Sequence, residues 1–130
     1  MERLILDTTV LVSVEREDEE LERLIADDDD VAIAAITAAE LLVGVELAGA
    51  KRRAKRALFV DAIIGTVGVE DYTLATARAH AGLLAHVKRS GTPRGAHDLV
   101  IAATAIATGR RLVTTDARGF DDLPDLQMRR

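Results

Sequence analysis

Short apolar runs alternate with longer segments of helical periodicity along this chain of 130 residues. Parallel strands joined by crossover helices produce this alternation, because each strand is buried on both faces while each helix keeps one polar face. We therefore expect an α/β fold with a central parallel sheet of four to five strands flanked by helices. The predicted strands are 3–6, 31–33, 66–69 and 111–114, with a weaker fifth near 126–128.

The segments between these runs have the spacing of amphipathic helices. Glycine readily takes the left-handed conformation that closes a helix, so Gly65, Gly91 and Gly109 mark three expected helix ends. The loop GTPRGA is the only stretch rich in proline and glycine, and it is too short to link two domains, so we expect one domain over residues 1–130. The predicted helices start at Thr8, cover 17–26, begin after Ile36, cover 50–64, fill DYTLATARAHAGLLAHVKRSG and cover 97–108.

The composition narrows the possible classes of protein. The chain has no cysteine, which excludes disulfides, thiolate nucleophiles and cysteine-ligated zinc. No apolar stretch approaches the roughly 18 residues of a membrane span. The chain does not open on a basic region followed by a cleavable apolar segment. We therefore expect a cytoplasmic protein without a membrane partner.

The net charge of -5 is unevenly distributed. Residues 15–30 contain ten acids and two bases, so the rest of the chain is net basic and could meet a polyanion. Candidate RNA contacts are Arg52 and Arg53 in the run KRRAKR, together with Arg94. The chain has only one Tyr and two Phe, so a stacking platform of the kind used by sheet-based RNA binders is not expected. If RNA is the polyanion, contacts to its backbone charge and a metal must do most of the binding.

Four acids are predicted at or just beyond the carboxyl ends of the strands, where open parallel sheets bind their ligands. Asp7 follows the first strand, Glu40 lies in the first turn of the helix after the second, Asp98 opens the last helix, and Asp116 follows the strand LVTT. Asp121 lies slightly further on. Carboxylates, with water and phosphate oxygens, are the ligands that Mg²⁺ or Mn²⁺ prefers.

Each acid also has a purely structural explanation. Asp7 could cap a helix, Thr37 and Glu40 match a capping box, and Asp98 suits the positive end of a helix dipole. These roles do not explain why like charges gather at one edge of a sheet, where they repel unless a cation is bound. The histidines lack the HExxH pattern of a zinc site. We expect His97 to lie on the surface or cap its helix, and the other two, at positions 80 and 86, to be structural.

Other functional classes fit less well. A phosphatase or phosphotransferase of the haloacid dehalogenase type begins from DxDx(T/V), whereas here DTTV lacks the second aspartate that serves as acid and base. A receiver domain needs an acidic pair and a late lysine, and LVTTDARG offers Asp and Arg. A non-catalytic interaction module with the same fold remains an alternative, although the presence of all four acids argues against it.

Three segments carry a resemblance to a known family: LDTTVL, TAAELLVGVELA and HDLVIAATAIATGRRLVTTDARGFDDLP. They resemble the PIN domain, and specifically the VapC toxins of type II toxin-antitoxin systems. The resemblance spans essentially the whole chain and implies a three-layer PIN-like fold. It implies a toxin that acts as a Mg²⁺-dependent endoribonuclease, with Mn²⁺ as an alternative ion, and cleaves structured RNA such as tRNA. A VapB-type antitoxin and a homodimer are the implied partners.

The resemblance also implies roles for particular residues. The implied catalytic set is the acidic cluster of Asp7, Glu40, Asp98 and Asp116. From the chemistry of phosphodiester hydrolysis we expect the three aspartates to hold one or two metal ions and the glutamate to orient or deprotonate the attacking water. Thr9 matches the hydroxyl residue that accompanies the first acid, and Asp121 is a further auxiliary. Many relatives carry asparagines where this chain has TTDARGF, so direct or water-mediated metal contact by Asp116 is left open.

Overall fold

The computed structural model describes residues 1–17 and 21–129 of the chain. Its parallel sheet has the strand order β3-β2-β1-β4, so the first strand lies inside the sheet. Ile5 of β1 pairs with Ala32 on one side and with Leu112 on the other. The strands are β1 (Arg3–Leu6), β2 (Asp30–Ala34), β3 (Gly68–Glu70) and β4 (Arg111–Val113).

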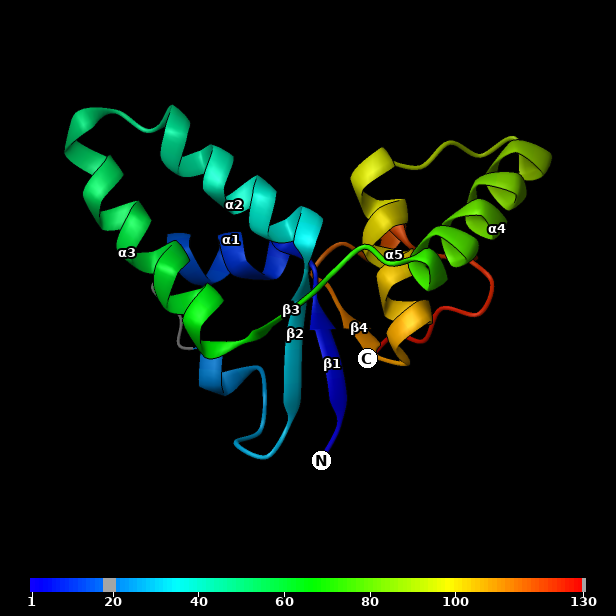
Figure 1. Cartoon of the computed structure of the whole chain (residues 1–130), viewed down its shortest axis with the longest axis horizontal. Helices are drawn as coiled ribbons and strands as arrows, with labels where there is room; N and C mark the ends of the chain where they lie inside the picture. Colours follow the sequence, from blue (N-terminus) through cyan, green and yellow to red (C-terminus); the bar gives the residue numbers. More distant parts are fainter. Residues whose placement is uncertain (18–20, 130) are drawn as a thin grey trace.

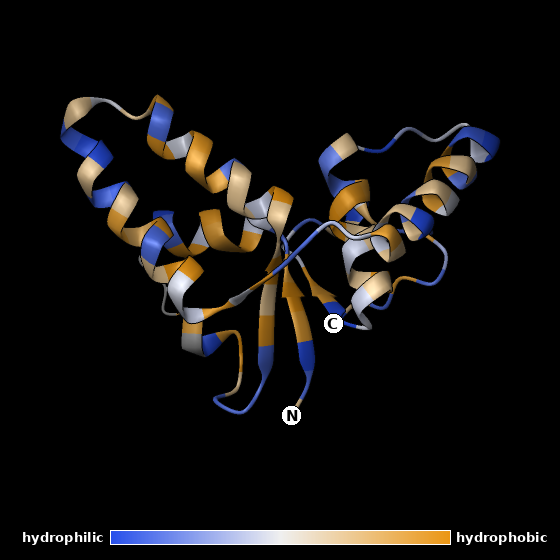
Figure 2. Ribbon diagram, viewed as in Figure 1, coloured by the Kyte–Doolittle hydropathy of each residue, from blue (hydrophilic) through white to orange (hydrophobic). Residues whose placement is uncertain are grey.

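Helices cover both faces of the sheet, which confirms the three-layer α/β prediction. Figure 1 shows the first three helices on one side of the strands and the last two on the other. Figure 2 shows hydrophobic residues along the central strands and on the helices that flank them. The helices are α1 (Thr8–Glu17), α2 (Ala35–Leu47), α3 (Ala50–Thr66), α4 (Leu74–Ser90) and α5 (Ala96–Thr108).

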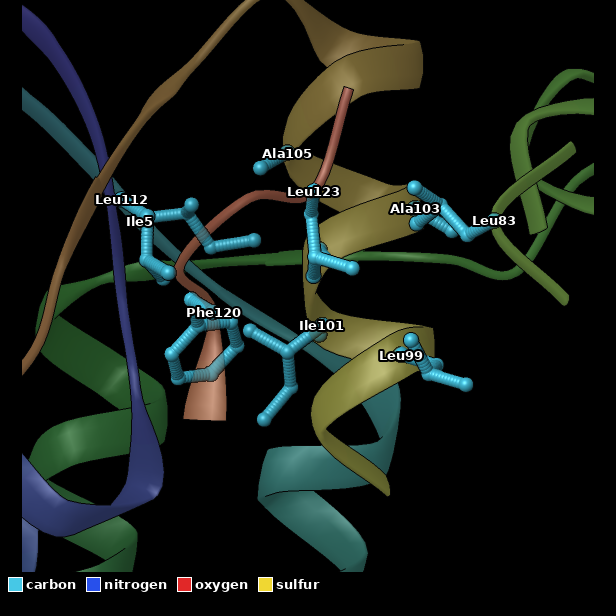
Figure 3. Close-up of a cluster of buried hydrophobic side chains, with 11 residues drawn as sticks. Ile5, Leu83, Leu99, Ile101, Ala103, Ala105, Leu112, Phe120 and Leu123 are labelled. Carbon is cyan, nitrogen blue, oxygen red and sulfur yellow. The ribbon is translucent and has the colours of Figure 1, made fainter. Parts of the chain in front are cut away.

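The alternation of side chains along β1 divides the core into two clusters. Leu4 and Leu6 face a cluster formed with the α1 and α3 side, whereas Ile5 faces the α5 side, because successive strand residues point to opposite faces. Figure 3 shows Ile5 with Phe120 and Ile101 in the second cluster. A buried strand between two apolar layers fixes the position of its last residue and hence of Asp7, which follows it.

The predicted glycine ends are confirmed for two helices and wrong for the third. Gly91 and Gly109 end α4 and α5 in the left-handed conformation, with φ of 69° and 67°. Gly65 does not end α3, which continues to Thr66, because an exposed glycine inside a helix costs only about 1 kcal/mol relative to alanine. The third strand consequently covers 68–70 instead of the predicted 66–69.

Three other predicted elements also differ. The predicted helix 17–26 falls partly on residues 18–20, outside the described residues. Its first residue is the end of α1, and from residue 21 to residue 26 only a 3-10 turn, Leu21–Arg23, is formed. Leu21 and Leu24 pack there against the Leu4 cluster, which fixes the chain in a turn. The fifth strand is reduced to a single parallel bridge between Met128 and Leu112. The last helix begins one residue before His97.

The Thr37 and Glu40 capping box is not formed. Helix α2 begins at Ala35, directly after β2, so Thr37 is already inside the helix and Glu40 lies in its second turn. The residue at the N-cap position, Ala34, makes no side-chain capping bond. The structural explanation for Glu40 therefore fails, and its carboxylate is directed elsewhere.

Arg110, which immediately precedes β4, is buried and ties three strands together. Its Nη1 donates to the carbonyl oxygen of Leu4 at 3.2 Å and to that of Asp30 at 2.8 Å. The same atom pairs with the Asp30 carboxylate at 3.1 Å, and Nε pairs with Glu70 at 3.2 Å. This guanidinium also holds the pKa of Asp30 below its usual value. In the part of the chain that the structure describes, no helix is long and apolar enough to cross a membrane.

Candidate active site

Asp7 is a nearly buried carboxylate held between two strand ends. Its backbone N–H donates to Val113 at 2.9 Å, which extends the pairing of β1 with β4 by one residue. Its side chain is 2% exposed, and Oδ2 accepts the hydroxyls of Thr9 at 2.8 Å and Thr114 at 2.7 Å. The Thr114 hydroxyl also accepts the backbone N–H of Asp116 at 3.0 Å. One threonine therefore fixes the positions of two of the predicted acids.

Glu40 reaches the same edge of the sheet from α2. Its Oε1 accepts the hydroxyl of Thr8 at 2.9 Å, and that hydroxyl also lies 3.2 Å from the hydroxyl of Thr37. Its Oε2 lies 3.3 Å from Nδ1 of His97 on α5. The His97 side chain is 56% exposed, which confirms the expected surface position, and its imidazole in addition contacts Glu40, which the sequence did not predict.

Asp98 lies in the first turn of α5 and is half-buried. Burial raises the pKa of Asp98 above its ordinary value, and the negative charges of the other three acids raise it further, whereas His97 opposes the shift. Asp7, Glu40 and Asp98 line one pocket, and the Thr114 hydroxyl bonds to both the Asp7 carboxylate and the backbone N–H of Asp116. The structure therefore brings the four predicted acids together.

Asp116 and Asp121 are both exposed. Asp116 stands at the start of the 3-10 turn Ala117–Gly119 and is one of the charges that act on Asp98. Asp121 is tied to the loop instead, because its carbonyl oxygen accepts Nη2 of Arg94 at 2.6 Å. Arg94 thus holds this loop in place, which is a structural contact that the sequence did not reveal.

A pocket of about 430 Å³ opens among these residues. Its wall contains three of the acids, hydroxyls from the start of α1, and a cation, Arg16, further along the same helix. The lining residues are Asp7, Thr8, Thr9, Val12, Ser13, Arg16, Glu40 and Asp98. Thr8, Thr114 and Arg16 were not predicted from the sequence as site residues. The paired threonines that follow Asp7 and those in LVTT were a signal for Thr8 and Thr114.

The donor set fits a hard divalent cation. Among residues 1–17 and 21–129, no group of three acidic or histidine side chains is close enough to bind one metal ion as the side chains stand. The same residues supply no Lys or Arg that pairs with any of the four carboxylates. Clustered carboxylates that pair with no basic side chain repel each other, and this repulsion adds to burial in raising the pKa of Asp98. A bound Mg²⁺ or Mn²⁺ would draw them together, since both ions prefer oxygen ligands.

Comparison with known proteins identifies the class. The PIN domain family matches residues 4–126, so the chain belongs to the PIN-domain family. Within that family its relatives are VapC proteins, as the sequence resemblance predicted. The chain is 30% identical over 130 residues to "tRNA(fMet)-specific endonuclease VapC" of Salmonella typhimurium, covering 98% of this chain and 97% of the relative. It is 35% identical over 132 residues to "Ribonuclease VapC19" of Mycobacterium tuberculosis, covering 95% and 96%.

Solved structures agree with this assignment. A chain of the DNA-bound VapBC complex from Salmonella typhimurium superposes with a TM-score of 0.87 at 27% identity, covering 99% of this chain and 98% of that one. A chain of VapBC2 from Rickettsia felis superposes with a TM-score of 0.88 at 24% identity, covering 98% and 97%. The second likeness concerns the fold alone.

Proposed function

We propose that this protein is the toxin of a VapBC-type pair and cleaves structured RNA with a divalent cation bound to Asp7, Asp98 and Asp116. The observation that carries the proposal is a pocket lined by Asp7, Glu40 and Asp98, with Asp116 linked to Asp7 through Thr114 and no described Lys or Arg paired with any of the four acids. Curated relatives that span nearly the whole chain are named ribonucleases, which supports RNA as the substrate. The name of the Salmonella relative makes tRNA the first RNA to test.

The residues in and around the pocket have different roles in the proposed reaction. Asp7, Asp98 and Asp116 would hold the divalent cation, which would acidify a bound water and polarise a phosphoryl oxygen. Thr9 and Thr114 hold the carboxylate of Asp7 in one orientation, so that it is prepared for the ion before binding. Glu40 is held from both sides by Thr8 and His97, in a position to orient the attacking water or accept its proton.

Cleavage assays test this function directly. The purified protein, free of antitoxin, is incubated with total tRNA and separately with rRNA, in Mg²⁺, in Mn²⁺ and in EDTA. We expect discrete fragments that require a metal and disappear in the Asp7→Asn variant. Asp61→Asn, which removes an exposed acid on α3, is the matched control and should cleave normally. Metal-independent cleavage, or full activity of Asp7→Asn, would refute the assignment.

A VapB-type antitoxin is the proposed protein partner, since the solved relatives are VapBC complexes. Helices α2 and α3 present exposed apolar side chains that such a partner could cover: Leu42, Val43, Leu47 and Leu58. We propose a homodimer of the toxin as well. Size-exclusion chromatography with light scattering, on the protein alone and after co-expression with a VapB-type antitoxin, measures both assemblies. A co-expressed toxin that elutes with no antitoxin bound would refute the complex, and a toxin that elutes as a monomer would refute the homodimer.

A further inference from the structure

A second hollow, of about 700 Å³, lies between α1 and α3. We refer to it as the basic groove. It is lined by Val14, Glu15, Arg16, Arg52, Lys55, Arg56 and Phe59. Figure 1 shows α1 and α3 on the same side of the sheet, away from α4 and α5.

The groove is positively charged, in contrast to the chain as a whole. Four bases and one acid line it, whereas the net charge of the protein is -5. The acid, Glu15, pairs with Nε of Arg56 at 3.6 Å, and the same guanidinium donates to the carbonyl oxygen of Gly44 at 3.3 Å. Arg56 is therefore a fixed part of the wall. Arg52 and Lys55 are exposed and define its charge toward the solvent.

Helical spacing explains why these side chains share one surface. Positions 52, 55, 56 and 59 follow the i, i+3, i+4, i+7 spacing of one helix face. Phe59, one of only three aromatic residues in the chain, ends this row and is half-buried against the core. The groove thus combines basic side chains with one aromatic ring. Proteins that bind single-stranded nucleic acids use the same combination, in which the basic groups contact phosphates and the ring stacks on a base.

The basic groove adjoins the active-site pocket along α1. Arg16 lines both hollows, and α1 forms a wall of each. Thr9, which bonds to Asp7, and Arg16 are seven residues apart on that helix, or about 10 Å along its axis. A strand whose phosphate lies at the acids can therefore run along α1 into the groove.

We infer that the basic groove binds the RNA strand on one side of the scissile bond. Arg16, Arg52 and Lys55 contact its phosphates, and Phe59 offers its ring to a base. This inference rests on the proposed ribonuclease function. It narrows the earlier expectation for RNA contacts, since Arg52 lines the groove, whereas Arg53 donates to the carbonyl of Glu46 and Arg94 to that of Asp121. Phosphate contacts position a substrate without reading its sequence, so the groove should act on any RNA that extends beyond the pocket.

Binding by the cleavage-deficient Asp7→Asn protein tests the groove separately from the chemistry. Fluorescence anisotropy with labelled tRNA compares this protein with a version that also carries Arg52→Gln and Lys55→Gln. We expect about tenfold weaker binding and a slope of log K against log salt that is smaller by about 1.4, as loss of two phosphate contacts on a single strand requires. Lys88→Gln with Arg89→Gln is the matched control, since both bases are exposed in the last turn of α4 and lie across the sheet.

Cleavage by the same pairs of substitutions in the otherwise unaltered protein completes the test. The groove variant should raise KM for long RNA and keep kcat, and it should cleave an oligonucleotide that fills only the active-site pocket as the unaltered protein does. Equal RNA affinity and equal salt slope in groove and control variants would overturn the inference. So would a groove variant that loses affinity for the antitoxin while it keeps its affinity for RNA. Absence of metal-dependent cleavage with groove-dependent RNA binding intact would instead refute the proposed function alone.

Discussion

The carboxylate of Asp98 occupies the space that a side chain at position 119 would need. A Cβ atom on Gly119 would lie 2.8 Å from Oδ2 of Asp98, which is closer than non-bonded atoms approach, and one on Gly95 would lie 3.2 Å from the same oxygen. The backbone of Gly119 is not in the left-handed region, where the structure places only Gly91 and Gly109 among its glycines. Glycine is therefore required at 119 for the position of a carboxylate and not for the path of the chain.

Gly119→Ala should consequently separate folding from activity. The backbone tolerates alanine, so we expect the melting temperature to change by no more than about 2 °C, while the displaced carboxylate weakens binding of Mn²⁺ and cleavage at least tenfold. Thermal shift on addition of Mn²⁺ and RNA cleavage measure the two effects. Gly82→Ala is the control, because nothing lies within 4 Å of a Cβ there and the helix should gain about 0.5–1 kcal/mol. Unchanged Mn²⁺ affinity in Gly119→Ala would contradict this account.

Asp98→Asn should stabilise the metal-free protein at neutral pH. The pKa of Asp98 is raised in the folded state, so folding favours its protonated form, and stability is lost as pH rises from the unfolded toward the folded pKa. Asparagine removes this penalty, and we expect a melting temperature a few degrees higher, about 2–6 °C. Melting curves in EDTA between pH 4 and pH 8 should show that the difference grows with pH. In Mg²⁺ the unaltered protein should gain stability and the variant should gain much less; equal gains would argue against metal binding by Asp98.

His97→Ala and Thr8→Val should each lower kcat with little change in KM. Both residues contact the carboxylate of Glu40, on different oxygen atoms, and removal of either contact allows that carboxylate to rotate. We expect a decrease of about threefold to tenfold for each, with a nearly unchanged melting temperature for His97→Ala because the imidazole is largely exposed. In a Glu40→Gln background neither substitution should reduce the residual rate further, since both act through Glu40. Additive losses in that background would show that they act elsewhere.

Arg110→Met should destabilise the fold without altering the site directly. It removes the donor to Glu70 and to two backbone carbonyls and one of the two cations paired with Asp30, and we expect a loss of about 3 kcal/mol in the free energy of unfolding. Urea denaturation measures this loss. Arg111→Gln is the control, because its pair with Glu2 at 3.0 Å is exposed and should contribute less than about 1 kcal/mol. Comparable losses in the two variants would contradict the role assigned to Arg110.

The positions of the four acids relative to the sheet could be predicted from the sequence, because burial determines which segments form strands. An apolar run that is buried on both faces reads as a strand, and an acid at its end must lie at the carboxyl edge of the sheet. The helix ends at Gly91 and Gly109 could also be predicted, because the left-handed backbone conformation that closes a helix favours glycine at that one position. The sequence alone therefore predicts that the four acids lie at the same edge of the sheet.

The failures share a different cause, which is tertiary context. The Thr37 and Glu40 motif matches a capping box, but β2 passes into α2 without a loop and removes the helix start that the motif needs. The contacts that orient the acids join residues far apart in the chain, with 32 positions between Thr8 and Glu40 and 107 between Asp7 and Thr114. No local pattern contains such pairs, and the contact between α2 and α5 through His97 is of the same kind.

The acids of neighbouring strands differ in whether a basic side chain pairs with them. Asp30, at the start of β2, has its counter-charge in Arg110, whereas the acids beyond β1 and β4 have none among the described Lys and Arg residues. Any cation that enters the pocket, whether an ion or a side chain of a partner, therefore shifts the folding equilibrium as well as the chemistry. We expect protease digestion to be faster in EDTA than in Mn²⁺, with the difference absent in Asp7→Asn. A toxin built this way would have a shorter lifetime once its partner is gone, so its release would also limit the duration of its action.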